Sequence, residues 1–283
     1  MAMRSQPLDD RLSKRDFDVL AEYIYNYSGI KMPHTKMTML EGRLRRRLRV
    51  TGMQTFDSYC DYLFKQGGIE AEAIFLIDAV TTNKTDFFRE PKHFEYMTKA
   101  ALPDILRNFN DRRIRTWSSA CSTGAEPYTM AMVLSDYLAA NAPERDYFVL
   151  ATDLSTDVLQ KAQRGIYQSE LLQPVPSEMM RKYVMRASDP RRHDMRMAPK
   201  LRSHVGFARL NLMDDAYAVG DPMHMIFCRN VLIYFDKQTQ NHVLTRLCDR
   251  LMPGGYLFIG HSETVTGFDL PIRQVANTIF RRV

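Results

Sequence analysis

Apolar residues recur every three or four positions through residues 11–80, a spacing that predicts amphipathic helices rather than strands. Ser13, followed three residues later by Asp16, is a capping-box-like helix start, and Gly29 ends that helix. Three further helices are expected around Met37–Leu48, over Thr55–Phe64 and over Ile69–Val80. Short helices joined by short loops predict an all-α N-terminal domain over residues 1–80.

The pattern changes after a polar, aromatic connector over residues 81–94, and strands then alternate with helices through residues 95–283. The expected strands are Arg113–Ser118, Tyr147–Thr152, His204–Leu210, Met223–Cys228, Gly255–Gly260 and Gln274–Arg281. The expected helices are Tyr128–Ala139, Asp157–Gln163 and Lys237–Leu251. This alternation predicts a largely parallel, doubly wound α/β sheet with right-handed crossovers. About forty residues separate two of these elements, far more than a crossover needs, so an inserted subdomain is expected at about 165–205.

Composition excludes several classes of protein. The chain has no apolar run of the ~18 residues that suggest a membrane span, and its N-terminus lacks the apolar segment of a secretory signal. Its four cysteines are widely spaced and form no CxxC pair. We therefore expect a cytoplasmic protein with neither a disulfide framework nor a metal site.

The formal net charge of +6 is concentrated in one segment. Residues 31–50 hold seven lysines and arginines against the single acid Glu41, so the rest of the chain is neutral in sum. This is a local basic patch, and it is not the composition of a general nucleic-acid-binding protein. No aromatic stacking platform is interleaved with it, which also disfavours nucleic acid.

Candidate chemistry lies at the ends of the predicted strands. The first strand leads into a turn with Gly124 and Glu126, and then into a helix expected to begin at Pro127. One glycine and a carboxylate suit an amine better than a pyrophosphate, and the GxGxxG pattern of dinucleotide folds is absent. Asp153 ends the next strand, where an acid accepts bonds from ribose hydroxyls, and Asn211 offers an amide to an adenine edge. Together they predict an aminoacyl nucleoside, S-adenosylmethionine, although Asp153 alone could be a helix N-cap and Asn211 a turn residue.

Four motifs resemble the chemotaxis receptor methyltransferases of the CheR family, and the similarity extends nearly from end to end. They are Thr81–Pro91 (TTNKTDFFREP), Trp117–Tyr128 (WSSACSTGAEPY), Phe227–Asp236 (FCRNVLIYFD) and Pro253–Glu263 (PGGYLFIGHSE). The resemblance implies a Rossmann-like class I methyltransferase sheet with a small antiparallel β subdomain, preceded by the helical domain. The family usually has Gly-Glu-Glu-Pro where this chain has Ala125 after the glycine, so the second acid of the pair is kept.

The resemblance also implies residue roles. Arg89 and Tyr234 match residues beside the methyl donor and the substrate side chain, and are the expected catalytic pair. The matched cofactor contacts are Asn83, Thr85, Arg89, Glu126, Asp153, Asn211, Leu212, Arg229 and Asn230. The implied reaction moves the methyl group of S-adenosylmethionine to glutamate side chains of chemoreceptors, leaving S-adenosylhomocysteine. A glutamate is ionised at neutral pH, so it needs positioning rather than a general base.

Several alternatives stay open. A surface ion pair with Glu90 or Asp86 would explain Arg89, and packing would explain Tyr234. Docking on glutamate-lined receptor helices is expected for Arg43, Arg46 and Arg49. The alternatives are that these arginines form a solvated basic face or bind phosphate. An inactive signalling adaptor is the alternative function, whereas base methylation is disfavoured because no Asn/Asp-Pro-Pro-Tyr motif follows Cys228. In some family members the inserted subdomain binds a receptor tether, but the loop at 187–194 lacks the glycine of those members. A regulatory protein partner stays open, because these residues do not identify one.

Overall fold

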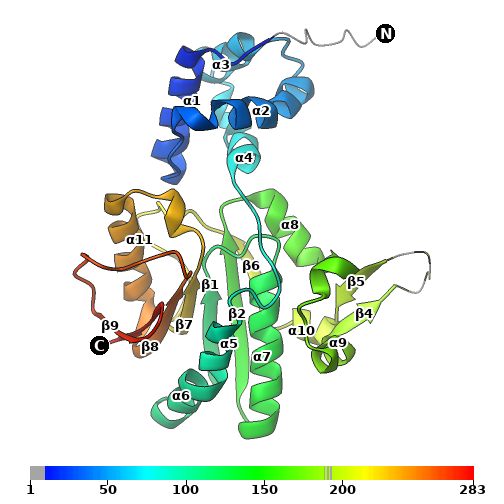
Figure 1. The fold of residues 1–283 in the computed structure, drawn as a ribbon, viewed down its shortest axis with the longest axis vertical. Coiled ribbons are helices and arrows are strands. Elements are labelled where there is room, and N and C mark those ends of the chain that lie inside the picture. Colours follow the sequence, from blue (N-terminus) through cyan, green and yellow to red (C-terminus); the bar gives the residue numbers. More distant parts are fainter. Residues whose placement is uncertain (1–9, 188, 190, 192) are drawn as a thin grey trace. The chain divides into compact units, whose positions relative to one another are not determined.

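A computed structural model describes residues 10–187, 189, 191 and 193–283, and it divides into two compact units (Figure 1). The division falls between Thr82 and Asn83, except that Tyr234–Asp236 belongs to the first unit. Each unit is described by itself. No helix of the described residues is both long enough and apolar enough to cross a membrane.

The first unit is helical. Its helices are α1 (Lys14–Ser28), the short η1 (His34–Lys36), α2 (Met37–Thr51), α3 (Phe56–Lys65) and α4 (Ile69–Val80). The Ser13 side chain accepts a hydrogen bond from Asp16 N, and Gly29 ends α1 in the left-handed conformation at φ 71°, so both predicted helix signals are confirmed. Apolar side chains from α1, α2, α3 and α4 are fully buried in this unit, and include Leu20, Leu44, Leu63 and Leu76.

The second unit contains a seven-stranded sheet in the order β6-β2-β1-β7-β8-β10-β9. Its strands are β1 (Arg113–Ser118), β2 (Asp146–Asp153), β6 (Val205–Arg209), β7 (Met223–Cys228), β8 (Leu251–Ile259), β9 (Ile272–Ala276) and β10 (Ile279–Arg282). The first five pair in parallel, and β10 pairs antiparallel with both β8 and β9. The predicted doubly wound, mostly parallel sheet is therefore confirmed.

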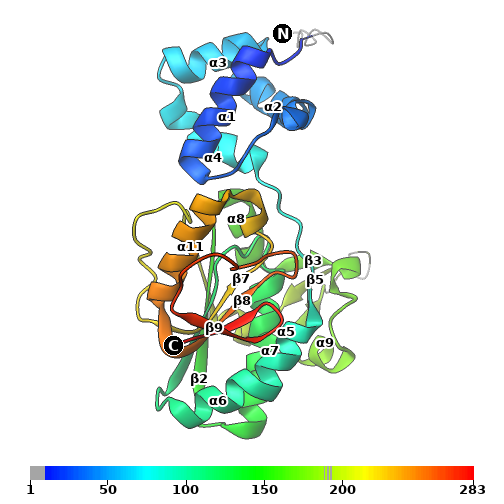
Figure 2. The same ribbon diagram turned by 60° about the vertical axis from the view of Figure 1, so that its left-hand side comes forward.

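The order of the strands creates a switch point between β1 and β7. From β1 the chain moves in one direction through α7 (Ala125–Asn141), β2 and α8 (Thr156–Arg164) to β6. It then returns to β7 and moves the other way through α11 (Lys237–Arg250) to β8. Because such crossovers are right-handed, α7 and α8 cover one face of the sheet and α11 the other (Figure 2). Open α/β sheets bind ligands at the carboxyl edge of a switch point.

The inserted subdomain is a three-stranded antiparallel sheet, β3-β5-β4, seen beside α9 and α10 in Figure 1. Its elements are β3 (Ile166–Gln168), η3 (Ser169–Leu172), α9 (Ser177–Tyr183), β4 (Val184–Arg186), β5 (Asp194–Met197) and α10 (Pro199–Arg202). Tyr167 of β3 meets Phe87 edge to face with ring centroids 5.0 Å apart, which anchors the subdomain to the core of this unit.

Some expected elements differ in the structure. The helix α7 begins at Ala125, two residues before Pro127, so Glu126 lies in its first turn. The polar connector ends at Glu90, because α5 (Pro91–Tyr96), the π-helical η2 (Met97–Ala101) and α6 (Leu102–Asn108) follow at once. The single C-terminal strand is a hairpin, since a turn at Asn277 and Thr278 separates β9 from β10. Thr278 takes a left-handed φ of 55° there.

Candidate active site

The turn between β1 and α7 requires its glycine for two reasons. Gly124 has φ 93°, and a Cβ there would lie 2.8 Å from the Tyr167 hydroxyl oxygen and 2.9 Å from Ala162 Cβ. Ser122 is also left-handed, with φ 50°, and its N–H points at the Asp153 carboxylate 2.7 Å away. The turn is thus fixed by the adjacent strand end rather than by several glycines.

Glu126 is held at the start of α7 by partners from two other strand ends. Ser118 Oγ at the end of β1 donates to Glu126 Oε1 at 2.7 Å, and Arg229 Nη1 lies 3.1 Å from Oε2. Burial raises the pKa of this carboxyl, while the Arg229 charge and the Ser118 hydroxyl oppose that shift. The predicted acid is therefore partly buried and already paired with a cation that the sequence did not connect to it.

Arg229, directly after β7, is the centre of this network. Its side chain is 1% exposed and lies between Glu126 and Glu90, with Nη2 3.0 Å from Glu90 Oε2. The same Nη2 donates to the Arg89 carbonyl. Burial opposes ionisation of Glu90, but the Arg229 charge and three hydrogen-bond donors outweigh it and lower the pKa of that carboxyl. Two carboxylates thus contact one guanidinium.

The connector takes an uncommon backbone path where it meets this network. Phe88 and Glu90 have φ 53° and 56°, in the left-handed region that non-glycine residues rarely occupy. Phe88 N donates to Thr129 Oγ1 at 3.2 Å, and Ser122 Oγ donates to the Asn83 carbonyl at 2.9 Å. Such strain concentrates at functional sites because surrounding contacts must hold it in place.

Arg89 lies next to Glu90 in the connector, but its guanidinium contacts a main-chain carbonyl rather than a carboxylate. Its Nη1 donates to the Lys84 carbonyl at 3.2 Å, and the side chain is half-buried. The ion pair with Glu90 that was weighed against a catalytic role is not formed, because Glu90 pairs with Arg229 instead. Thr85 lies in the irregular stretch of the same connector.

Asp153 ends β2 with 9% of its surface exposed. Its Oδ2 accepts from Ser122 N and its Oδ1 accepts from Ser155 N at 3.0 Å. The N-cap of α8 is Ser155, so the N-cap interpretation of Asp153 is wrong. These two main-chain N–H groups orient the Asp153 carboxylate at the end of β2.

Asn211 lies two residues beyond the end of β6, which stops at Arg209 rather than Leu210. Its Oδ1 accepts from Met213 N at 3.1 Å, so the residue does build a turn, as the alternative interpretation held. Leu212 beside it is 6% exposed. The adenine contact of both residues stays a prediction.

Two glutamates that contact the residues after β7 were missed by sequence reasoning. Glu90 was considered only as a partner of Arg89, and Glu263 only as part of a motif. Glu263 is 7% exposed and accepts hydrogen bonds from four main-chain N–H groups. Burial raises the pKa of Glu263, although these donors oppose the shift. Asparagine tolerates a left-handed φ, but glutamate rarely adopts one, and both glutamates contact residues far away in the sequence. The sequence therefore carried no local signal for these contacts.

One group of side chains has the composition of a metal site. Ligand atoms of Glu90, His93 and His261 lie within 4.8 Å of one another. The Arg229 guanidinium already binds the carboxylate of this group. Burial, with the nearby Arg229 charge, lowers the pKa of His93 to about 4, so its imidazole is neutral at pH 7.

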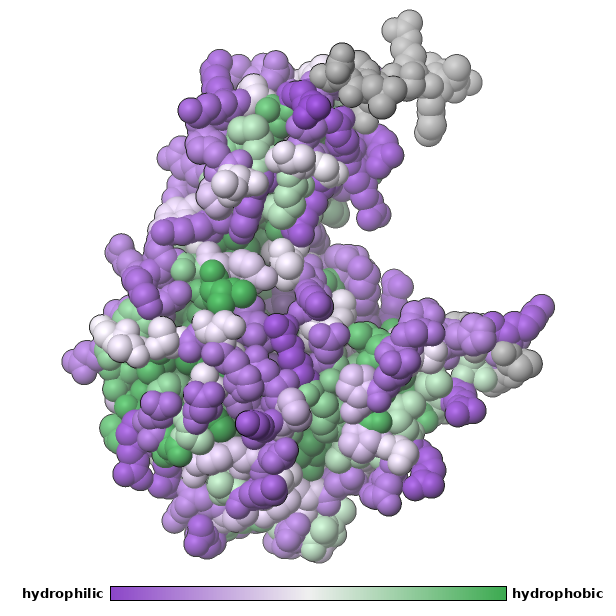
Figure 3. All heavy atoms as spheres, in the orientation of Figure 1, coloured by the Kyte–Doolittle hydropathy of each residue, from purple (hydrophilic) through white to green (hydrophobic). Residues whose placement is uncertain are grey.

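The remaining predicted residues belong to the first unit. Tyr234 ends the short helix η4 (Leu232–Tyr234) and is half-buried. On α2, Arg43 donates to the Val80 and Thr81 carbonyls at 2.6 and 2.9 Å, so it binds the end of α4. Arg46 and Arg49 are exposed, on a unit whose visible face is mostly hydrophilic in Figure 3.

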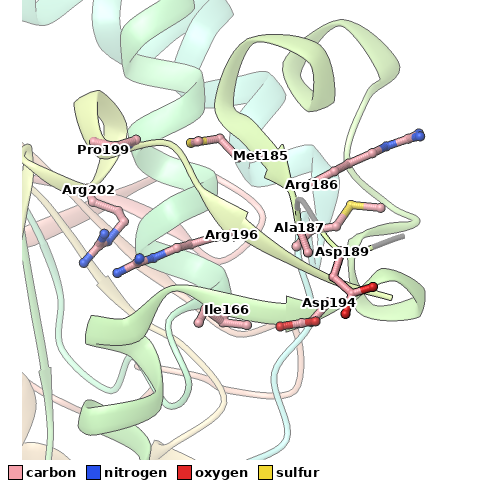
Figure 4. A pocket seen from close by; sticks show the side chains of 10 residues that line it. Ile166, Met185, Arg186, Ala187, Asp189, Asp194, Arg196, Pro199 and Arg202 are labelled. Carbon is pink, nitrogen blue, oxygen red and sulfur yellow. The ribbon is translucent and has the colours of Figure 1, made fainter. Parts of the chain in front are cut away.

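A separate cavity of about 510 Å³ lies in the β subdomain (Figure 4). Arg196 and Arg202 extend their guanidinium groups toward the same side of it. Arg196 Nε donates to the Arg164 carbonyl at 3.1 Å, and Arg202 Nη2 donates to the Gln163 carbonyl at 3.2 Å. Residues 188, 190 and 192 of the glycine-free loop lie outside the described residues, so the expectation about this loop remains untested.

The switch point and the polar set at its carboxyl edge define a Rossmann-like class I methyltransferase that uses S-adenosylmethionine. Carboxylates at Glu126 and Asp153 and the amide of Asn211 follow three neighbouring parallel strands, and this donor set fits an amine, ribose hydroxyls and a base.

The chain belongs to the CheR methyltransferase family. Residues 83–280 match the CheR methyltransferase SAM binding domain, and residues 15–81 match the CheR methyltransferase all-alpha domain. It is 39% identical over 269 residues to the chemotaxis protein methyltransferase of Escherichia coli, covering 95% of this chain and 91% of that protein. The chemotaxis protein methyltransferase of Borreliella burgdorferi is 37% identical over 263 residues, 92% of either chain.

Proposed function

We propose that this methyltransferase acts in the cytoplasm on chemoreceptors and converts glutamate side chains of their helical regions to γ-methyl esters. The observation that carries the proposal is the pairing of family membership with the contact pattern of Arg89. Glu90 and Glu126 are occupied by Arg229, whereas the Arg89 guanidinium donates to a main-chain carbonyl. No carboxylate of the described residues pairs with Arg89, so its guanidinium suits a carboxylate substrate.

Methyl transfer to a carboxylate mainly requires that the protein position the two reactants. The cofactor supplies a methyl group on a positively charged sulfur. A substrate carboxylate is ionised at neutral pH, so no general base is needed, and the protein must align its oxygen in line at about 3–3.5 Å. Arg89 orients that carboxylate, and Tyr234 adds a hydroxyl to the substrate or the cofactor. Asn83, Thr85, Glu126, Asp153, Asn211, Leu212, Arg229 and Asn230 bind the cofactor.

The basic helix α2 is proposed to bind the receptor. Arg43 holds the end of α4, and Arg47 pairs with Glu72 at 2.6 Å, so these two arginines support the fold of the unit. Arg46 and Arg49 are exposed on the same helix. Exposed arginines complement glutamate-rich helices of a receptor, so we assign docking to Arg46 and Arg49 and a mainly structural role to Arg43.

A labelled-methyl assay tests the proposal. The purified chain is incubated with methyl-labelled S-adenosylmethionine and a cytoplasmic chemoreceptor fragment, and the product is then treated with alkali. A glutamate methyl ester releases labelled methanol under alkali, whereas methylated nitrogen retains its label. Alkali-released label that disappears when the receptor glutamates are changed to alanine is the expected result. Label that survives alkali would overturn the ester assignment, and no transfer to any receptor would overturn the proposed substrate.

A further inference from the structure

The turn after β7 is held from both sides by two glutamates that come from distant parts of the chain. Glu90 contacts the side chains of the turn: Asn230 Nδ2 donates to Glu90 Oε1 at 3.2 Å, and Arg229 pairs with Glu90 Oε2. Glu263 contacts its main chain. Glu263 Oε1 accepts from Val231 N and Leu232 N at 2.9 and 2.7 Å, and Oε2 accepts from Asn230 N at 3.0 Å.

The geometry of this turn depends on a carboxylate at Glu263. Three successive N–H groups converge on one side chain at a turn where Asn230 takes a left-handed φ of 59°. Convergent main-chain N–H groups form an anion-binding concavity, and hydrogen bonds to an ionised acceptor are roughly twice as strong as neutral ones. The buried carboxylate therefore supplies the negative charge that holds Asn230 in an otherwise rare conformation.

The same carboxylate binds the neighbouring strand end. Gly260, directly after β8, donates its N–H to Glu263 Oε2 at 2.6 Å. A Cβ at Gly260 would lie 2.9 Å from Asn230 N, 2.9 Å from Glu263 Oε2 and 2.6 Å from Asn230 Nδ2. Even one methyl group at this position would thus push against Asn230 and the Glu263 carboxylate. Gly260→Ala is therefore a second way to perturb the turn, and it keeps the glutamate at position 263.

We propose that Glu263 is a positioning residue for the cofactor site, which acts by fixing the main chain of Asn230–Leu232 and so the side chains of Arg229 and Asn230. The inference rests on the proposed cofactor contacts of those two residues. Glu263 itself contacts neither the cofactor nor the substrate in this scheme. Its effect reaches the cofactor through the orientation of Asn230 and through the Arg229 guanidinium that binds Glu126.

The test measures the Kd of S-adenosylhomocysteine by calorimetry for Glu263→Gln and Gly260→Ala, below the melting temperature of each variant. The glutamine places an NH₂ group where main-chain N–H groups already point, and the alanine pushes against Asn230. Both are expected to raise the Kd at least tenfold at a stoichiometry near one. A purely structural role would lower the stoichiometry, because part of the protein is unfolded, and would leave the Kd of the folded part unchanged.

Matched controls come from the helical unit. Glu72→Gln alters another buried carboxylate, 5% exposed, and Gly42→Ala adds a methyl where nothing lies within 4 Å. Neither should change the Kd. An unchanged Kd in Gly260→Ala, or in folded Glu263→Gln, overturns the inference, and Gly260→Ala decides alone if Glu263→Gln does not fold. Asn230→Ala separates failure of this inference from failure of the proposed cofactor contact. If Asn230→Ala also binds S-adenosylhomocysteine with the wild-type Kd, the proposed contact between Asn230 and the cofactor is wrong.

Discussion

Two arginines of this chain are bound by glutamates: the half-buried Arg47 in the helical unit and the buried Arg229 at the edge of the sheet. Arg47 on α2 donates from Nε and Nη2 to the two carboxylate oxygens of Glu72 on α4, at 3.0 and 2.6 Å. The Tyr59 hydroxyl also donates to Glu72. Arg229 instead contacts two carboxylates, Glu90 and Glu126.

The two arrangements differ in charge balance. The pair of Arg47 and Glu72 matches one positive charge with one negative charge, in the bidentate geometry that is typical of stabilising contacts. At Arg229, one guanidinium contacts two carboxyls, so a negative charge is in excess whenever both are ionised. An amino group of a ligand can neutralise that excess. The unequal charges around Arg229 support the proposed site for an amine-bearing cofactor, whereas the balanced pair of Arg47 and Glu72 supports the fold of the helical unit.

The largest expected effect comes from Arg89, which pairs with no carboxylate of the described residues. Arg89→Ala removes the proposed substrate clamp, and a loss of roughly 100-fold in kcat/KM for the receptor corresponds to about 2.7 kcal/mol of transition-state stabilisation. The labelled-methyl assay measures it. Because the side chain donates only to the Lys84 carbonyl among the contacts described, the melting temperature should change little. Wild-type turnover by Arg89→Ala would remove Arg89 from the mechanism.

The second-largest effect is expected from substitution of Asp153. Asp153→Ala removes the proposed ribose ligand, and it also removes the acceptor for Ser122 N and Ser155 N. Losing hydrogen bonds to a charged acceptor costs about 1.5–3 kcal/mol, so the Kd of S-adenosylhomocysteine should rise by roughly 10- to 100-fold. Calorimetric titration measures the change. Asp153→Asn keeps one oxygen acceptor and should lie between the wild type and the alanine variant; equal affinity in all three proteins would refute the ribose assignment.

The strand ends were largely predictable, but the contacts between side chains were not. Glu126 and Asp153 stood out because apolar runs stop just before them, and a parallel sheet brings such ends to one edge. Arg229, the partner of Glu126, could be placed at the same edge, but the spacing of apolar residues does not tell which side chains are in contact. The helices over residues 91–108 were missed although Pro91 is a helix-start signal, because the aromatic connector was extended over it.

A third prediction sets the two arginine pairs against each other. Glu72→Gln should lower the free energy of unfolding by about 2 kcal/mol, because it leaves the Arg47 charge poorly compensated, and should leave cofactor affinity unchanged. Glu126→Gln should mainly weaken cofactor binding and change the free energy of unfolding less. It should raise the Kd of S-adenosylhomocysteine by about tenfold, which is 1.4 kcal/mol, with a smaller change in stability, because Glu90 still pairs with Arg229. Chemical denaturation measures the free energy of unfolding of both variants, and calorimetry measures their Kd for S-adenosylhomocysteine. If both variants change the two quantities equally, the two arginine sites do not differ in role.

The smallest effect is expected on the exposed side of α2, where Arg46 and Arg49 form no ion pair with any residue that the structure describes. Reversing the charge of Arg46 and Arg49 together should raise the receptor KM severalfold, since exposed ion pairs contribute about 0.2–1 kcal/mol each. The effect should shrink as salt is added, and cofactor Kd should not move. The matched control reverses Lys14 and Arg15, two exposed cations on α1. Because this control makes the same change in net charge, an equal rise in KM would show that only total charge matters and that α2 is not a docking surface.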